Sequence, residues 1–202
     1  MDSGVSVNRR IPQQERGERR VAELLEAASV EFAEVGYDAA TMKAIARRAG
    51  ASIGAVYQYF RNKEAVVSAL RTQYVNEIEE QWMELEEAAA GIPVRDRTQG
   101  FIEVMIRFME DHPGYVTILD APADSKRDKK IRDRLRERLA NVICTRRPAV
   151  SQEQAYRVAC VSLQMIKSMN ALYAESKLQE RLEIVEEYKL ALTAYLEKRL
   201  PS

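Results

Sequence analysis

The stretch Gly50-Ala-Ser-Ile-Gly-Ala-Val-Tyr-Gln-Tyr-Phe-Arg-Asn-Lys-Glu64 decides the fold of this 202-residue chain. Ser52 is suited to cap a short helix that runs to about Tyr59, because its hydroxyl can accept a hydrogen bond from a backbone amide of the first turn. Thr41 is suited in the same way to cap a helix that begins at Met42 and ends near residue 48. Gly50 lies between them and tolerates the left-handed backbone conformation of a tight turn. Two helices joined by such a turn make a helix-turn-helix.

A longer helix is expected to precede this unit and to pack against it. Apolar residues recur with helical spacing up to Phe32, on a helix that begins near Arg16. Gly36 is suited to end that helix. The sequence therefore predicts a small domain over residues 16–62, after a flexible polar arm over residues 1–15.

The rest of the chain predicts helices and no strand. Asn62 can cap a long helix over residues 63–90, which Gly91 and Pro93 end. Further helices are expected around residues 101–109, 115–119, 131–143, 152–176 and 178–200. The fold class is therefore all-α with about nine helices: an N-terminal three-helix helix-turn-helix domain followed by a C-terminal helical bundle over residues 63–202.

Charge is distributed unevenly along a chain whose formal net charge is zero. Residues 41–63 contain lysines and arginines but no aspartate or glutamate, whereas residues 75–87 contain glutamates but no lysine or arginine. The basic window can face phosphates, although it can equally be an ordinary solvated face. Basic residues also outnumber acidic ones over residues 124–147, where an amphipathic helix is favoured over a second nucleic-acid surface.

Several classes of protein do not fit the sequence. No apolar run is long enough to span a membrane, and the first twenty residues contain no apolar block, so neither a membrane segment nor a secretory signal is expected. Cys144 and Cys160 are expected to be free thiols of a cytoplasmic protein, with a redox pair as the alternative. Because His112 is the only histidine and no phosphate loop or serine nucleophile elbow occurs, we expect no catalytic residue, metal or cofactor.

The run from Ser52 to Glu64 has the form Ser-x-Gly-x-hydrophobic-Tyr-x-Tyr-Phe-x-x-Lys-Glu, which closely resembles the signature of the tetracycline-repressor (TetR) family of regulators. The segment from Thr41 to Gly50 resembles the family's second helix, and the resemblance covers about residues 18–70. It implies a homodimer that binds a palindromic double-stranded DNA operator. It also implies a small-molecule effector in a variable C-terminal domain and, most commonly, repression that the effector relieves. A helical module that binds only proteins is the alternative.

The resemblance places the second short helix in the major groove of DNA. Gln58 can then read an adenine edge, and Ala55 can touch a thymine methyl group. Ile53 either contacts a base in the same way or only covers Tyr57. Gly54 leaves room for a close approach to the DNA backbone.

Other residues of the unit are expected to bind phosphates. Tyr57 and Tyr59 resemble the family's phosphate-contacting tyrosines, with core packing as the alternative for each. Lys63 begins the long helix, where its charge and the helix dipole both attract an anion. Thr41 and Ser52 either contact DNA or act as caps alone. The predicted DNA-binding residues are Thr41, Lys43, Ser52, Ile53, Gly54, Ala55, Tyr57, Gln58, Tyr59 and Lys63.

The C-terminal half carries two apolar stripes that can form a four-helix bundle with a second chain, or can close the chain's own core. These stripes are Val158, Ser162, Met165, Met169 and Leu172 in one helix and Leu178, Leu182, Val185, Leu192 and Leu196 in the next. An effector site is expected among flexible and aromatic residues, which favours an apolar or aromatic effector, although such stripes are often ordinary core. The predicted ligand-binding residues are Trp82, Phe101, Met105, Phe108, Met109, Tyr115, Met165, Met169 and Tyr173.

Overall fold

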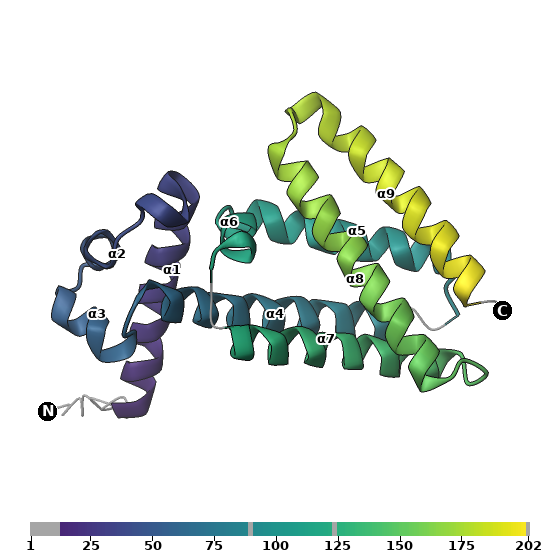
Figure 1. Ribbon diagram of the computed structural model, residues 1–202, viewed down its shortest axis with the longest axis horizontal. Coiled ribbons are helices and arrows are strands. Elements are labelled where there is room, and N and C mark those ends of the chain that lie inside the picture. The colour runs from purple at the N-terminus through teal and green to yellow at the C-terminus, as the bar shows by residue number, and fades with distance from the viewer. Residues whose placement is uncertain (1–12, 89–90, 123–124, 201–202) are drawn as a thin grey trace, which may run out of the picture.

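The computed structural model describes residues 13–88, 91–122 and 125–200, which form nine helices and no strand. The first three helices, α1 (Gln13–Ala39), α2 (Met42–Arg48) and α3 (Ile53–Tyr59), gather at one end of the molecule (Figure 1). The predicted all-α class and the order of the helices are therefore confirmed. Helix α1 begins at Gln13, before the predicted start at Arg16, and most of the predicted arm lies outside the described residues.

Local hydrogen bonds explain where the short helices begin. The Thr41 and Ser52 hydroxyls accept hydrogen bonds from Ala44 N and Ala55 N, each at 3.1 Å. Gly36 has a φ of 77° and bends the last turn of α1. Gly50 has a φ of 59° in the turn between α2 and α3, as its position predicted.

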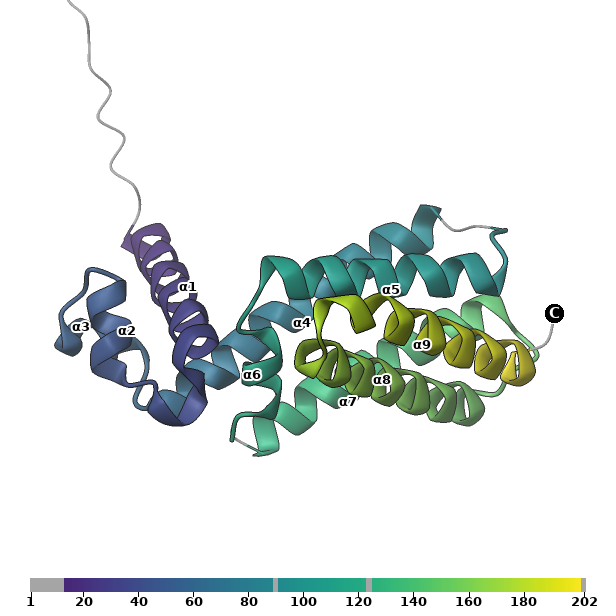
Figure 2. The ribbon, with the colours of Figure 1, turned by 90° about the horizontal axis from the view of Figure 1, so that it is seen from above.

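Helix α4 (Lys63–Ala88) leaves the three-helix unit and runs along the rest of the molecule (Figure 1). The other helices of the C-terminal half are α5 (Val94–Asp111), α6 (Tyr115–Asp120), α7 (Ser125–Arg146), α8 (Gln152–Glu175) and α9 (Leu178–Arg199). Helix α7 packs along α4, and α8 and α9 lie side by side (Figure 2). Among the described residues, no helix is both long and apolar enough to cross a membrane.

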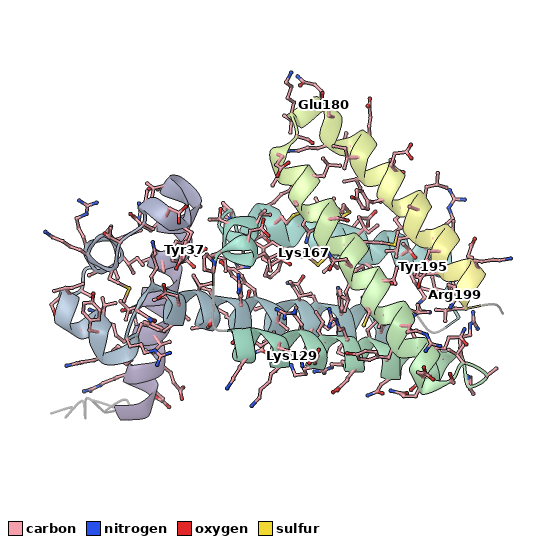
Figure 3. The ribbon with its side chains drawn as sticks, viewed as in Figure 1. Tyr37, Lys129, Lys167, Glu180, Tyr195 and Arg199 are labelled. Carbon is pink, nitrogen blue, oxygen red and sulfur yellow. The ribbon has the colours of Figure 1, made fainter. Side chains whose placement is uncertain are left out.

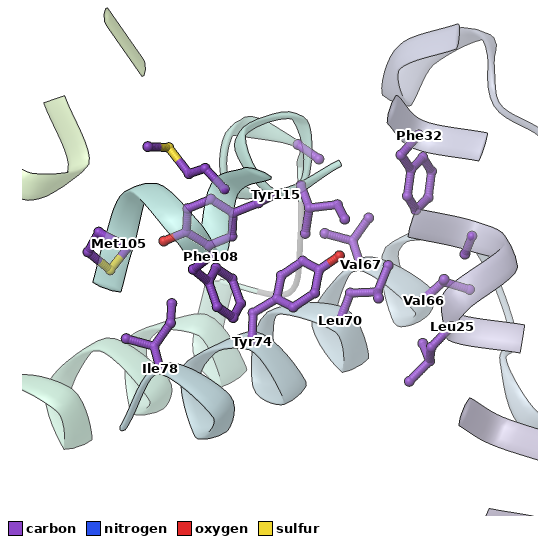
Figure 4. Close-up of a cluster of buried hydrophobic side chains, with 14 of the residues drawn as sticks. Leu25, Phe32, Val66, Val67, Leu70, Tyr74, Ile78, Met105, Phe108 and Tyr115 are labelled. Carbon is purple, nitrogen blue, oxygen red and sulfur yellow. The ribbon is translucent and has the colours of Figure 1, made fainter. Parts of the chain in front are cut away.

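One hydrophobic core runs without interruption from the helix-turn-helix into the C-terminal bundle. Phe32 of α1 and Val66 of α4 belong to it, as do Tyr74 of α4 and Phe108 of α5 (Figure 4). Tyr74 meets Phe108 edge to face at a centroid distance of 5.5 Å. Because close-packed cores transmit displacement, the two halves of the chain are mechanically connected.

Two glutamates of the acidic window of α4 pair with arginines of α7. Glu79 is only 4% exposed and pairs with Arg134 at 3.4 Å and Arg138 at 3.1 Å. Near the other end of α4, Glu86 pairs with Arg146 at 3.4 Å. Several basic residues of the run over residues 124–147 therefore hold two helices together, in agreement with the amphipathic helix that the sequence favoured.

Candidate nucleic-acid interface and sensing cavity

Helix α3 has one exposed, polar face, and its opposite face is buried. Val56 is fully buried, whereas Tyr57 is 53% exposed and Gln58 and Tyr59 are also exposed. Among the other predicted contacts, Thr41, Lys43, Ser52, Ile53 and Gly54 are exposed and Ala55 is half-buried. The alternative that Tyr57 or Tyr59 is a core residue therefore does not hold.

Lys63 has contacts that the sequence did not reveal. Its ammonium group donates hydrogen bonds to the carbonyl oxygens of Tyr37, Asp38 (3.2 Å) and Ala40 (3.0 Å). It also lies 4.2 Å from the centroid of the Tyr37 ring. Lys63 thus ties the start of α4 to the end of α1, and its contact with a phosphate stays a prediction.

Arg48 also has a structural partner. It pairs with Glu31 at 3.1 Å and with Glu34, so α2 is fastened to α1. Among the described residues, no ion pair or side-chain hydrogen bond engages the other basic side chains of the window. These are Lys43, Arg47 and Arg61, which are all exposed. Their charges remain available to an anionic partner.

A small set of contacts joins the helix-turn-helix to the C-terminal half. The Ser29 hydroxyl of α1 and the Tyr74 hydroxyl of α4 share a hydrogen bond of 2.7 Å. Burial raises the pKa of Tyr74 to about 12. Gly114, at the start of α6, lies so close to α1 that an added Cβ atom would be 2.5 Å from the Ser29 carbonyl oxygen.

Helix α6 is held on its other side by Arg71 of α4. The Arg71 guanidinium donates hydrogen bonds to the carbonyl oxygens of Ile118 and Leu119, both at 2.9 Å, and to that of Ala121. These carbonyls lie at the end of α6, where a helix leaves acceptors unpaired. Helix α6 therefore lies between α1 and α4, next to the cavity described below.

The largest described cavity, with a volume of about 190 Å³, lies among α4, α5, α6, α7 and α8. Of the predicted ligand-binding residues, Trp82, Met105 and Tyr115 line it. Phe101 lines two smaller cavities of about 40 and 100 Å³.

The other predicted ligand-binding residues line none of these three cavities within the described part of the chain. Phe108, Met109 and Met169 are buried in the core, because their faces of α5 and α8 pack on neighbouring helices. Met165 is half-buried. Tyr173 is half-buried too, with its hydroxyl 3.4 Å from a Glu110 carboxylate oxygen.

Sequence reasoning missed the polar lining of the largest cavity. Arg132 and Arg136 of α7 line it, together with Gln164, Lys167 and Asn170 of α8. The arginines were attributed to a solvated helix face, because a sequence does not show which neighbour a charged face meets. The spacing of the three α8 residues by three places them on one face and was the available signal.

The two predicted apolar stripes divide between core and surface. Val158, Met169, Val185 and Leu192 are buried within the chain, and Ser162 is 6% exposed. For these residues the prediction of a dimer contact is wrong and the alternative of an internal core holds. The exposed apolar side chains of α8 and α9 are Val161, Leu172, Leu178, Leu182 and Leu190. Val161 and Leu190 were not among the predicted stripes.

The chain joins a helix-turn-helix, whose second helix is exposed, through α4 to a helical domain with a cavity. This architecture is that of a helix-turn-helix transcription regulator. Residues 24–70 match the family model described as bacterial regulatory proteins of the TetR family, and residues 93–196 match that of the tetracycline repressor-like C-terminal domain. The chain belongs to the TetR family, as its signature indicated.

Similar proteins support this assignment. An uncharacterised helix-turn-helix-type transcriptional regulator, YhgD of Bacillus subtilis, is 27% identical over 50% of this chain and 52% of its own. The helix-turn-helix-type transcriptional repressor KstR2 of Mycobacterium tuberculosis is 32% identical over 49% of this chain and 48% of its own. The matches thus span about half of these relatives. A TetR-family regulator from Streptomyces coelicolor superposes with a TM-score of 0.70 at 26% identity, over 91% of this chain and 98% of that one.

Proposed function

We propose that this protein is a ligand-responsive, DNA-binding transcription regulator that acts in the cytoplasm. It is a repressor that a small effector with an apolar or aromatic body releases from a palindromic operator. The observation that carries the proposal is the face of α3, where Tyr57, Gln58 and Tyr59 are exposed beside the fully buried Val56. The proposed DNA-binding domain covers residues 16–62, and the sensing and dimerisation domain covers residues 63–202.

The residues of α3 have different roles in this proposal. Gln58 reads a base edge, and Ile53 and Ala55 contact thymine methyl groups. Gly54 permits a close approach to DNA, while Tyr57 and Tyr59 bind phosphates and fix the register. Thr41 and Ser52 are committed to capping their helices, but their exposed positions also leave them within reach of the DNA backbone.

Repression requires two copies of the chain. Leu178 and Leu182 of α9 are each 75% exposed, and Val161 and Leu172 of α8 are also exposed. Covering this surface with α8 and α9 of a second chain forms a four-helix bundle about a two-fold axis. In a DNA-bound dimer the two copies of α3 lie about 34–36 Å apart, one turn of the double helix.

The effector acts through α6. A ligand in the cavity touches Tyr115 of α6 and the face of α4 that includes Trp82. Helix α6 packs on α1 through Gly114 and Ser29, so a shift of α6 reaches the helix-turn-helix. The effector lowers DNA affinity to the extent that it binds one arrangement of the helices more tightly than the other.

Fluorescence anisotropy tests the DNA-binding proposal. A labelled duplex from the DNA that flanks the protein's own gene is compared with a scrambled duplex at several salt concentrations. If the flanking and the scrambled duplex bind equally, duplexes selected from a random pool are tested next. We expect tight binding that competitor DNA does not displace and that weakens steeply with salt. Equal, weak binding by selected and scrambled duplexes contradicts the proposal and favours a module that binds only proteins.

Two lysine variants control for charge. Lys43→Ala removes an exposed charge beside α3, whereas Lys129→Ala removes an exposed charge on α7 (Figure 3). Lys43→Ala is expected to reduce the slope of log affinity against log salt by about 1. Lys129→Ala should leave the slope unchanged. If both variants reduce the slope equally, DNA binding depends on the net charge of the protein and not on the face that contains Lys43.

A further inference from the structure

The inner wall of the largest cavity contains polar groups without partners. Asn170 is 1% exposed, and among the described residues neither atom of its amide group has a hydrogen-bond partner. The indole nitrogen of Trp82, on α4, is buried and likewise has no hydrogen-bond partner in the part of the chain that the structure describes. Buried polar groups without partners are costly and rare in native proteins, so an unpaired amide in a cavity wall indicates a site for a polar atom.

Tyr115 is the neighbour of Asn170 in this wall. Its hydroxyl lies close enough to the Asn170 amide for that amide to lower the pKa of Tyr115, but burial is the larger effect and raises this pKa far above its usual value. Tyr74 directs its hydroxyl towards α1, whereas Tyr115 directs its own away from α1 (Figure 4). A ligand atom at this wall therefore touches the side chain that connects the cavity with α6.

The outer part of the cavity is cationic. Arg132 and Lys167 are exposed, Arg136 is partly exposed, and no carboxylate is found among the described lining residues. Arg136 pairs with Asp133 at 3.3 Å and Lys167 pairs with Asp120 at 3.4 Å, both near the surface. Arg132 has no ion-pair partner in the described residues. A guanidinium at the mouth of a cavity is suited to bind a carboxylate by two parallel hydrogen bonds.

Most of the remaining lining of the cavity is apolar. Ile78 of α4, Leu135 of α7, and Leu163 and Ile166 of α8 line it. An apolar wall with a few placed polar groups is typical of a small-molecule site, in which the apolar part supplies affinity and the polar groups set orientation.

We propose that the effector is a monocarboxylate with an apolar body, bound with its carboxylate at Arg132 and Arg136 and with an oxygen atom of its far end at Asn170. The proposal rests on the sensing role proposed above and names the chemical class that the cavity takes. A cation would face the arginines without a counter-charge. A plain hydrocarbon would leave the Asn170 amide unpaired. A carboxylate at Asn170, which is 1% exposed, would lose more of its hydration than one at the exposed Arg132.

Calorimetry on the full chain, without DNA, tests the chemical class. The probes are straight-chain carboxylates of six to twelve carbons, their ω-hydroxy derivatives, and the primary amines of equal length. We expect carboxylates to bind and amines to bind at least about tenfold more weakly. The ω-hydroxy acid of the best length should bind about three- to tenfold more tightly than the plain acid. Amines that bind as tightly as carboxylates overturn the proposal.

Arg132→Gln tests the cationic mouth, with Lys129→Gln as a control on the same helix. Arg132→Gln is expected to weaken carboxylate binding about tenfold and to leave the binding of the corresponding alcohol unchanged. Lys129→Gln should affect neither. If the two variants weaken carboxylate binding equally, the carboxylate does not bind at Arg132, and the proposed orientation is wrong.

Asn170→Leu tests the inner wall, because leucine has a similar volume but no polar atom. We expect this variant to raise the Tm of the ligand-free protein, since it removes an unpaired buried amide. It should also abolish the preference for the ω-hydroxy acid and keep the binding of the plain acid. If the Tm falls, or if the variant still prefers the ω-hydroxy acid, the Asn170 amide stabilises the fold and does not bind the ligand.

These results are independent of the DNA-binding experiment. Carboxylate binding together with a failure to bind any selected duplex contradicts the proposed regulator and leaves this inference standing. Specific duplex binding without any carboxylate binding overturns this inference alone.

Discussion

Lys63 illustrates how one side chain can hold two helices. Its ammonium group binds three carbonyl oxygens at the end of α1. We expect Lys63→Met to lower the free energy of unfolding by about 1–2 kcal/mol, because the carbonyls lose a charged donor. The Tm measured by circular dichroism should fall by several degrees. Lys43→Met, which changes an exposed lysine without such partners, should not change the Tm.

The same variant tests the phosphate role of Lys63. If the operator affinity of the folded Lys63→Met protein equals that of the unaltered chain, Lys63 only positions the helices. If the fully folded variant binds the operator more weakly and its affinity depends less steeply on salt, Lys63 contacts a phosphate.

Tyr57 and Gln58 are adjacent, but their variants should behave differently. Tyr57→Phe removes one exposed hydroxyl, so the Tm should stay the same while affinity falls about three- to tenfold on every operator variant. Gln58→Ala should instead relax the preference at one base pair. Anisotropy with a set of singly substituted operators measures both. A base-specific effect of Tyr57→Phe would contradict its assignment to a phosphate.

At the scale of the elements, Gly114 sets the distance between α6 and α1. Gly114→Ala places a Cβ atom 2.5 Å from the Ser29 carbonyl oxygen, so α6 must move away. We expect a loss of about 1–3 kcal/mol and a lower Tm. Gly17→Ala is the matched control, because no atom lies within 4 Å of the added Cβ and alanine favours the helix. Equal Tm values for the two variants would contradict the close packing of α6 on α1.

The elements that the sequence could predict are those with local causes. Thr41 and Ser52 bond to amides three residues away, and Gly50 adopts its conformation by itself, so neighbouring residues suffice to place α2 and α3. The cavity has no such local cause. It is built by helices far apart in the chain, and Arg132 lines it only because α7 packs along α4.

At the scale of the whole molecule, α8 and α9 expose apolar side chains that a second copy can cover. Val161 and Leu172 lie about three turns apart on the same face of α8. The double variant Val161→Glu with Leu172→Glu should be monomeric in sedimentation experiments, because dimerisation would bury two carboxylates on each chain. Ile92→Glu, at an exposed position between α4 and α5, should remain dimeric. A dimeric double variant would exclude this face from the interface.

The division of the apolar stripes also belongs to this scale. The helical period predicts that Val158 and Leu172 belong to one apolar stripe, but it does not show whether the surface that covers the stripe belongs to the same chain. The structure buries Val158 internally and leaves Leu172 exposed. Only the arrangement of all the helices separates the internal core from the candidate interface.

The arginines of α7 have a consequence for the divergence of this lineage. Arg134 and Arg138 fasten α7 to Glu79, whereas Arg132 and Arg136 face the cavity from the other side of the stripe that contains Leu135. After a gene duplication, the second pair can drift towards other charges while the first pair keeps the helix in place. Under the sensing role proposed here, we expect single substitutions in the second pair to change the ligand charge that the cavity accepts and to leave α7 fastened to α4.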